Sequence, residues 1–218
     1  GTVIQTIQLT DGPVQFAKWQ HPLEAPGDFE QEHVDFFGRW IKPGDMAIDI
    51  GAFTGDTTVP MAVAAGSNGL VLGLEPNPYV FKVLEENAGL NRDKTNIVPL
   101  NFAATETDGT FTFEYSDASF CNGGFLSKIE GGGEHKAQHK YKLDVAGKNL
   151  MRYLDEHYAD RLPRLKLVKI DAEGYDKEII KSLSGLLQAH HPAVITECLP
   201  ALNDTERDEL LAALTENG

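Results

Sequence analysis

The sequence has few cysteines, no long apolar run and no excess of basic residues, and each of these absences excludes a class of protein. Two cysteines among 218 residues, Cys121 and Cys198, lie in different contexts and favour a reduced, cytoplasmic protein over a disulfide-stabilised secreted one. No apolar stretch approaches the roughly 20 residues of a membrane-spanning helix. The formal net charge of −14 argues against nucleic acid or an anionic membrane surface as the main partner.

The most informative stretch that the chain does contain is MAIDIGAFTGDT at positions 46–57. An apolar, β-prone run ends in a glycine loop, defined here as residues 51–55, and an apolar helical segment follows at 57–65. Gly51 and Gly55 permit a tight turn and the close approach of a ligand to the backbone. Strand, glycine loop and helix in this order predict the first unit of a nucleotide-binding α/β fold.

The acidic residues around the glycine loop distinguish between two classes of ligand. The loop lacks the middle glycine of the G-x-G-x-x-G dinucleotide motif, Asp49 precedes it and Asp56 follows it. Carboxylates at this place repel a pyrophosphate but suit a cationic sulfonium. Glu75 ends the next apolar run, 24 residues after Gly51, where such folds place an acid on the ribose hydroxyls. The pattern therefore favours S-adenosylmethionine over a dinucleotide.

Alternating and helical patterns predict a single domain over residues 1–218, with a hairpin and helix at 1–41 and a Rossmann-like core at 42–218. After the first strand, further strands are expected at 70–75, 96–102, 111–115, 140–145, 165–171 and 193–198, and helices at 79–90, 150–158, 176–187 and 205–214. This alternation predicts an α/β fold with an open, mostly parallel sheet and helices on both faces. The glycine-rich segment 116–140 is expected to be an insertion, either a lid or a disordered stretch.

Polar residues mark the ends of five of the expected strands. Because ligands of open parallel sheets bind at the carboxyl ends of the strands, these side chains are expected to converge on one site. They are Asp49, Glu75, Asn101, Asp171 and Glu197.

Three sequence blocks together resemble the FkbM-type S-adenosylmethionine-dependent methyltransferases. They are the block from KPGD at 42–45 through Gly55, the GLEPNP run at 73–78 and the VKIDAEGY run at 168–175, with VITE at 194–197 in support. The resemblance covers about residues 30–197. It implies a Rossmann-like class I fold and methyl transfer to a hydroxyl of a sugar, glycan or polyketide-like small molecule. The C-terminal strands of that fold are apparently missing, so the sheet edge is expected to be unfinished, which would favour a homodimer.

The resemblance also implies roles for individual residues. Glu75 would hold the ribose hydroxyls, Asn101 and Ala103 would lie near the adenine, and Asp171 would sit beside the methyl group. The implied cofactor-binding set comes from the glycine loop and the following strand ends: Asp49, Gly51, Ala52, Thr54, Gly55, Asp56, Thr57, Glu75, Pro76, Asn77, Asn101, Ala103 and Asp171.

The candidates for the base that takes the acceptor proton are Asp171, Glu173 and Glu197. Asp171 is favoured because it ends a core strand, although it could instead bind only the amino group of the cofactor. Glu173 could instead stabilise the start of the following helix. No metal is expected, although the three carboxylates could hold Mg²⁺.

Two other functions stay open at this point. One is a non-catalytic methyltransferase-like module that binds a partner. The other is a dinucleotide-binding oxidoreductase, against which the missing middle glycine and Asp49 both argue.

Overall fold

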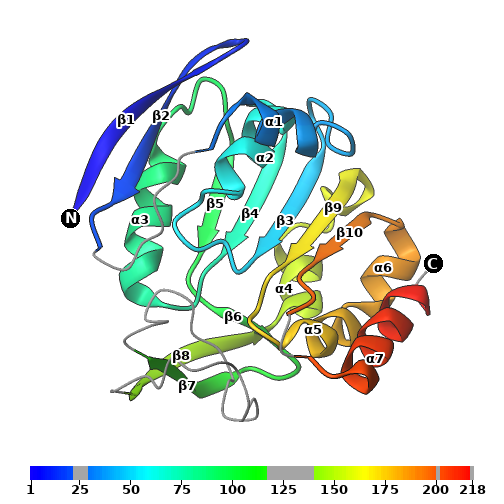
Figure 1. The fold of residues 1–218 in the computed structure, drawn as a ribbon. Coiled ribbons are helices and arrows are strands. Elements are labelled where there is room, and N and C mark those ends of the chain that lie inside the picture. The colour runs from blue at the N-terminus through cyan, green and yellow to red at the C-terminus, as the bar shows by residue number, and fades with distance from the viewer. Residues whose placement is uncertain (22–28, 117–139, 200–201, 217–218) are drawn as a thin grey trace.

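The structure is a computed structural model that describes residues 1–21, 29–116, 140–199 and 202–216 (Figure 1). Its centre is a five-stranded parallel sheet with the order β10-β9-β3-β4-β5. The strands are β1 Thr2–Leu9, β2 Gly12–Trp19, β3 Met46–Ile50, β4 Leu70–Leu74, β5 Ile97–Leu100, β6 Ala103–Thr105, β7 Gly109–Ser116, β8 Lys140–Asn149, β9 Leu165–Ile170 and β10 Ala193–Thr196. The helices are α1 Gln31–Phe37, α2 Thr58–Ala65, α3 Pro78–Gly89, α4 Leu150–His157, η2 Leu162–Arg164, α5 Asp176–Ser182, α6 Ser184–His190 and α7 Asp204–Thr215.

The two central strands form because their sequences are apolar on both faces. All five residues of β3 and all five of β4 are buried, as expected for parallel strands covered on each side. From β3 the chain builds outward through β4 to β5, and it then returns to the other side of β3 with β9 and β10. The strand order therefore reverses between β3 and β9, which is where ligands of such sheets bind.

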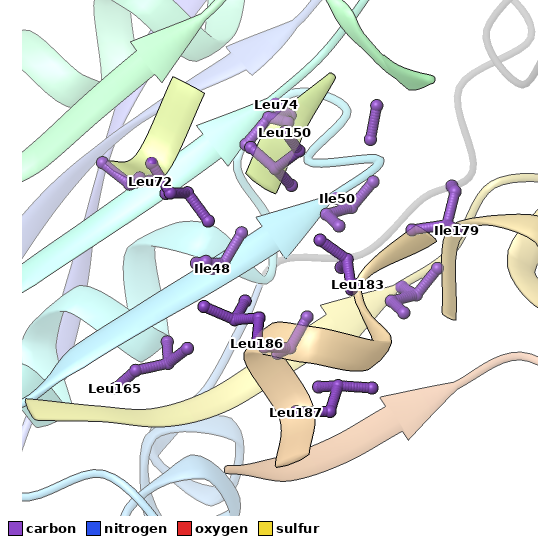
Figure 2. Packing of buried hydrophobic residues seen from close by; sticks show 14 of the residues in the cluster. Ile48, Ile50, Leu72, Leu74, Leu150, Leu165, Ile179, Leu183, Leu186 and Leu187 are labelled. Carbon is purple, nitrogen blue, oxygen red and sulfur yellow. The ribbon is translucent and has the colours of Figure 1, made fainter. Parts of the chain in front are cut away.

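Alternate residues of each strand point into two separate cores. Ile48 and Leu72 pack with residues of α4, α5, α6 and α7, and Figure 2 shows this core with Leu150 of α4 and Leu186 of α6. Ala47 of β3 packs on the opposite face with residues of α1, α2, α3 and the N-terminal strand β2. Helices thus cover both faces of the sheet, which confirms the predicted α/β class.

Two smaller sheets flank the central one. The predicted N-terminal hairpin is present as the antiparallel pair β1–β2, which lies beside α3 (Figure 1). Strands β6, β8 and β7 form a three-stranded mixed sheet in which β8 runs on to Asn149, beyond the expected end at 145. Most of the predicted insertion at 116–140 lies outside the described residues.

The prediction of one continuous helix at 176–187 was wrong. The segment 176–187 is divided into α5 and α6, which meet at Leu183. Leu183 is fully buried in the core, and the Ser182 Oγ donates to the Ile179 carbonyl oxygen at 2.7 Å, so side-chain burial and local hydrogen bonding favour a change of direction there. After β10, the described part of the chain contains one further helix, α7, and no strand.

No helix among the described residues is both long and apolar enough to cross a membrane. The cytoplasmic location and the homodimer stay predictions.

Candidate active site

The carboxyl ends of the five parallel strands form one edge, called the carboxyl edge below, and the five predicted polar residues lie along it. Backbone hydrogen bonds connect neighbouring strand ends: Glu75 N donates to Leu100 O at 3.0 Å, and Asp171 N donates to Ile50 O at 2.9 Å. At the outer strand, Glu197 N donates to the Ile170 carbonyl at 3.2 Å. These strand ends are therefore adjacent along the edge, whereas the convergence of the five side chains on one ligand site stays a prediction.

The glycine loop lies against the neighbouring strand ends. Gly51 has φ +80° and Gly55 has φ +97°, the left-handed region that favours glycine. A Cβ on Gly51 would overlap the carbonyl oxygen of Asp171, so the end of β9 packs directly on the loop backbone. The N–H groups of Gly51 and Ala52 both donate to the Leu74 carbonyl, at 3.0 and 2.9 Å. The loop is therefore fixed between the ends of β4 and β9.

Glu75 faces the glycine loop as a buried carboxylate with only 6% of its surface exposed. Its Oε2 accepts the Phe53 N–H at 3.1 Å and its Oε1 accepts the Asn77 N–H at 2.7 Å. Burial raises the pKa of Glu75 from its ordinary 4.5 to about 8, although both N–H groups favour the charged form. Each oxygen retains a further lone pair, so the side chain fits a pair of ribose hydroxyls.

Asp49 is fully buried beneath the loop and is engaged within the protein. Its Oδ2 accepts the Thr57 and Thr58 hydroxyls at 2.8 and 2.6 Å, and these residues begin α2. Its Oδ1 lies 3.2 Å from the Lys169 Nζ. The structure therefore shows Asp49 orienting the first turn of α2.

Lys169 is a site residue that the sequence reasoning missed. It is buried in β9, and its Nζ lies between Asp49 and the Oδ2 of Asp171, 3.4 Å from the latter. These two carboxylates raise its pKa against the opposing effect of burial. The available signal was a second lysine in β9, three residues after the exposed Lys166 and one residue before the strand ends at the carboxyl edge.

Three carboxylates form what is called the acid cluster below: Asp171, Glu173 and Glu197, whose oxygens come within 4.8 Å of one another. Burial and the nearby charges of Asp171 and Glu197 raise the pKa of Glu173 from 4.5 to about 7. Partial burial and the Asp171 carboxylate also raise the pKa of Glu197. Glu173 has φ +50°, an uncommon conformation for a residue with a side chain. The oxygens are of the kind that Mg²⁺ prefers.

A cavity of about 710 Å³ opens beside the acid cluster. Glu173 and Glu197 form part of its wall, and residues of α5 and α7 form much of the rest. Leu199, Leu202 and Leu210 give it an apolar side. The cavity is large enough for a small-molecule acceptor, and it adjoins titratable groups.

The other predicted cofactor residues have varied environments. Ala52, Thr54 and Asn77 are buried, Pro76 is half-buried, and Asp56 is exposed. The Asn77 Oδ1 accepts the Tyr79 N–H at 3.0 Å and caps α3.

The two residues predicted near the adenine lie in different settings. Asn101 is exposed after β5, and its Nδ2 donates to the Glu75 carbonyl at 2.8 Å. Ala103 lies in β6, buried with Phe113 and Val145 of the small sheet. Their contacts with a cofactor stay predictions.

The strand order, the glycine loop and the acid at the end of β4 define a Rossmann-like α/β protein of the methyltransferase class. Residues 49–218 match the model of the Methyltransferase FkbM domain, and the chain belongs to this family. S-adenosylmethionine is the cofactor of the family, and the loop with its facing carboxylate fits this ligand.

Two curated relatives are similar to parts of the chain. The hexuronic acid methyltransferase AglP of Haloferax volcanii is 25% identical over 163 residues, which are 73% of this chain and 59% of that protein. The methyltransferase sdnD of Sordaria araneosa is 26% identical over 131 residues, 52% of this chain and 51% of that protein. The chain thus spans between half and three-fifths of the length of these relatives.

Solved structures that match parts of the chain include a SAM-dependent O-methyltransferase from Thermotoga maritima, with 14% identity and a TM-score of 0.45 over 97% of this chain and 62% of that one. Another is TYW2 of P. horikoshii in complex with MeSAdo, with 20% identity and a TM-score of 0.32 over 48% of this chain and 39% of that one.

Proposed function

We propose that the chain binds S-adenosylmethionine at the carboxyl edge and transfers its methyl group to a hydroxyl of an acceptor held in the adjacent cavity. The observation that carries this proposal is the buried Glu75 carboxylate facing the glycine loop, with one backbone N–H on each oxygen. Packing alone does not require an acid there, since burying a carboxylate is costly unless it has partners. A ribose with two adjacent hydroxyls would supply the missing donors.

The glycine loop and the ion pairs beneath it would position the cofactor. Gly51 and Gly55 let the loop backbone pack against Asp171 and Leu84. Asp49 with Lys169 holds the start of α2 and the end of β9 together. Asp171, which follows that end, belongs to the acid cluster. When bound, the cofactor supplies a methyl group activated by a sulfonium. The residues of this chain would then orient the two reactants and exclude water.

Glu173 is our proposed base, with Asp171 as the positioning carboxylate. Glu173 borders the cavity, and its pKa of about 7 lies near the usual working pH of a general base. A Glu173 carboxylate oxygen would take the proton of the acceptor hydroxyl. Asp171 is held by its ion pair with Lys169, which suits a side chain that orients rather than one that exchanges protons. The left-handed backbone of Glu173 is consistent with a functional constraint.

The proposed acceptor is a sugar or glycan hydroxyl, with a polyketide-like small molecule as the second candidate. The relative AglP is named as a hexuronic acid methyltransferase. A cavity that combines carboxylates with leucines offers hydrogen-bond acceptors for hydroxyls and an apolar face for a sugar ring.

The first test is a calorimetric titration of S-adenosylhomocysteine, with NADH as the control. We expect one-site micromolar binding of the first and none of the second, and Glu75→Ala should abolish binding. Binding of NADH alone would replace this proposal by a dinucleotide-dependent function.

The second test separates catalysis from binding. Glu173→Gln should bind S-adenosylhomocysteine like the wild type but transfer labelled methyl from S-adenosylmethionine to a hydroxylated acceptor about 10²–10⁴-fold more slowly. Glu178→Gln is the matched control, because Glu178 borders the same cavity outside the acid cluster. Equal rates for the two variants would rule out Glu173 as the base. Cofactor binding without transfer to any acceptor screened would favour the partner-binding module.

A further inference from the structure

One buried amide connects three segments that are distant in the sequence. Asn87 of α3 is 1% exposed, and its Oδ1 accepts the Ala17 N–H of β2 at 2.7 Å. Its Nδ2 donates to the Ala17 carbonyl at 3.0 Å and to the Thr54 carbonyl in the glycine loop at 2.8 Å. The side chain therefore joins the N-terminal hairpin, α3 and the glycine loop, and the hairpin precedes the residues that match the family model.

The hairpin also reaches the glycine loop through an aromatic contact. The Trp19 ring, at the end of β2, lies edge-on to the Phe53 ring with 6.3 Å between centroids. Phe53 is the loop residue whose N–H donates to Glu75, and its backbone has φ +49°. Two consecutive loop residues, Phe53 and Thr54, are thus contacted by Trp19 and Asn87.

These contacts act on the part of the loop where the backbone adopts an uncommon conformation. Phe53 and Gly55 both have positive φ, and the Gly55 N–H donates to the Ala52 carbonyl at 2.8 Å. The Asn87 Nδ2 fixes the direction of the Thr54 carbonyl and so orients the peptide that joins Thr54 to Gly55. A fully buried amide with satisfied partners selects one arrangement, because any other leaves polar groups unpaired.

We propose that Asn87 is a positioning residue through which the N-terminal hairpin holds the glycine loop in its cofactor-binding conformation. The inference rests on the proposed function, since it takes this loop as the S-adenosylmethionine site. It makes the hairpin, which lies outside the family-matched segment, part of the machinery that sets cofactor affinity (Figure 1).

Asn91 provides a matched control for this proposal. Its Oδ1 accepts the Gln15 N–H at 2.8 Å and its Nδ2 donates to the Gln15 carbonyl at 2.8 Å, the same pair of bonds to β2 that Asn87 makes. These side-chain bonds go to β2 and not to the glycine loop. Because Asn91 has φ +55°, Asn91→Gly removes the bridge without adding backbone strain.

The experiment compares Asn87→Ala with Asn91→Gly in the full chain by two measurements. Calorimetry should show that Asn87→Ala raises the Kd of S-adenosylhomocysteine about 3- to 10-fold, the loss expected for one hydrogen bond that orders the loop, while Asn91→Gly leaves it unchanged. Hydrogen–deuterium exchange without ligand should be faster over residues 51–57 in Asn87→Ala only. Both variants should lower the melting temperature, because both loosen the hairpin.

Equal Kd values and equal loop exchange in the two variants would overturn the proposal. If Asn87→Ala does not fold, Trp19→Ala takes its place, since it removes the other contact with the loop, and it should show the same two effects. A wild type that binds no S-adenosylhomocysteine would refute the proposed function instead. Loop exchange needs no ligand, and would still decide whether Asn87 positions the loop.

Discussion

Glu75→Gln replaces the buried, titrating carboxyl group by a neutral amide of nearly the same shape, and it should change how the stability of the protein depends on pH. Folding raises the pKa of Glu75 from 4.5 to about 8. Between these values the folded state binds one more proton than the unfolded state, so the free energy of unfolding falls as the pH rises. The side chain is 6% exposed, so solvent screening reduces this effect only slightly.

The slope is about 1.4 kcal/mol per pH unit, and the full loss across the window is at most about 4–5 kcal/mol. Stability from Glu75 is complete below pH 4.5 and lost above about pH 8. The glutamine variant has no such slope. It also gives up one good backbone hydrogen bond, at a cost of about 1–3 kcal/mol, because its amide nitrogen cannot accept the N–H of Phe53 or Asn77. The variant should therefore be the less stable protein near pH 5 and the more stable one near pH 8.5.

Urea denaturation at half-unit steps from pH 5 to 9 measures both curves. Glu173 titrates in the same range, but it does so in both proteins, so the difference between the curves isolates Glu75. Glu178→Gln, which changes an exposed acid, should keep the wild-type slope. Parallel curves for wild type and Glu75→Gln would refute the claim that Glu75 is protonated in the ligand-free protein.

The same pKa predicts proton release when the cofactor binds. At pH 7 a carboxyl group with a pKa of about 8 is about nine-tenths protonated, and ribose hydroxyls can donate two hydrogen bonds only to its charged form. S-adenosylhomocysteine should therefore release about 0.9 proton at pH 7 and about 0.1 at pH 9. Calorimetry in buffers of different ionisation enthalpy measures this number. Glu75→Gln corrects for the ligand's own titrating groups, and an equal release from that variant would rule out the ribose assignment.

Two further substitutions test the support beneath the loop. Lys169→Met should lower the free energy of unfolding, measured by urea denaturation, by about 3–5 kcal/mol, because it leaves the buried Asp49 without its cation. Adding Asp49→Asn should recover part of this loss. A decrease of less than about 1 kcal/mol in Lys169→Met would contradict the pairing. Gly51→Ala should raise the Kd of S-adenosylhomocysteine more than tenfold, since its Cβ would overlap the Asp171 carbonyl at φ +80°, whereas Gly89→Ala, which meets nothing within 4 Å, should leave it unchanged.

The sequence alone predicted the central sheet well, because its strands carry unambiguous signals. β3 and β4 are short apolar runs bounded by glycine, proline or acidic residues, and each is followed by a helical pattern. Once the strands are parallel, their carboxyl ends share one edge, so the placing of Glu75, Asp171 and Glu197 together follows from topology.

The side-chain contacts that organise this edge could not be predicted in the same way. In the sequence, Asn87 is one polar residue within a predicted helix. Only the structure, in which β2 packs on α3, shows that Asn87 is buried and hydrogen-bonded to the glycine loop. The break between α5 and α6 depends on how Leu183 packs in the core. The helical pattern of apolar residues over 176–187 gives no sign of this break. Both features result from contacts between segments far apart in the chain, and a local pattern carries no information about those.

Several carboxyl groups lie close together at the carboxyl edge of a protein whose net charge is already −14. Ion pairing and protonation of these groups reduce their mutual repulsion. Asp49 and Asp171 share the ammonium group of Lys169, so one of their two negative charges is compensated within the fold. Glu75, with a pKa of about 8, is mostly neutral at pH 7, and Glu173, with a pKa of about 7, is about half charged. The ligand-free site therefore has much less electrostatic repulsion than four charged carboxylates would cause. A cofactor with ribose hydroxyls and a sulfonium favours the charged form of these carboxyl groups. Its binding and the ionisation of the site are therefore expected to be one coupled event, in which the ligand replaces protons.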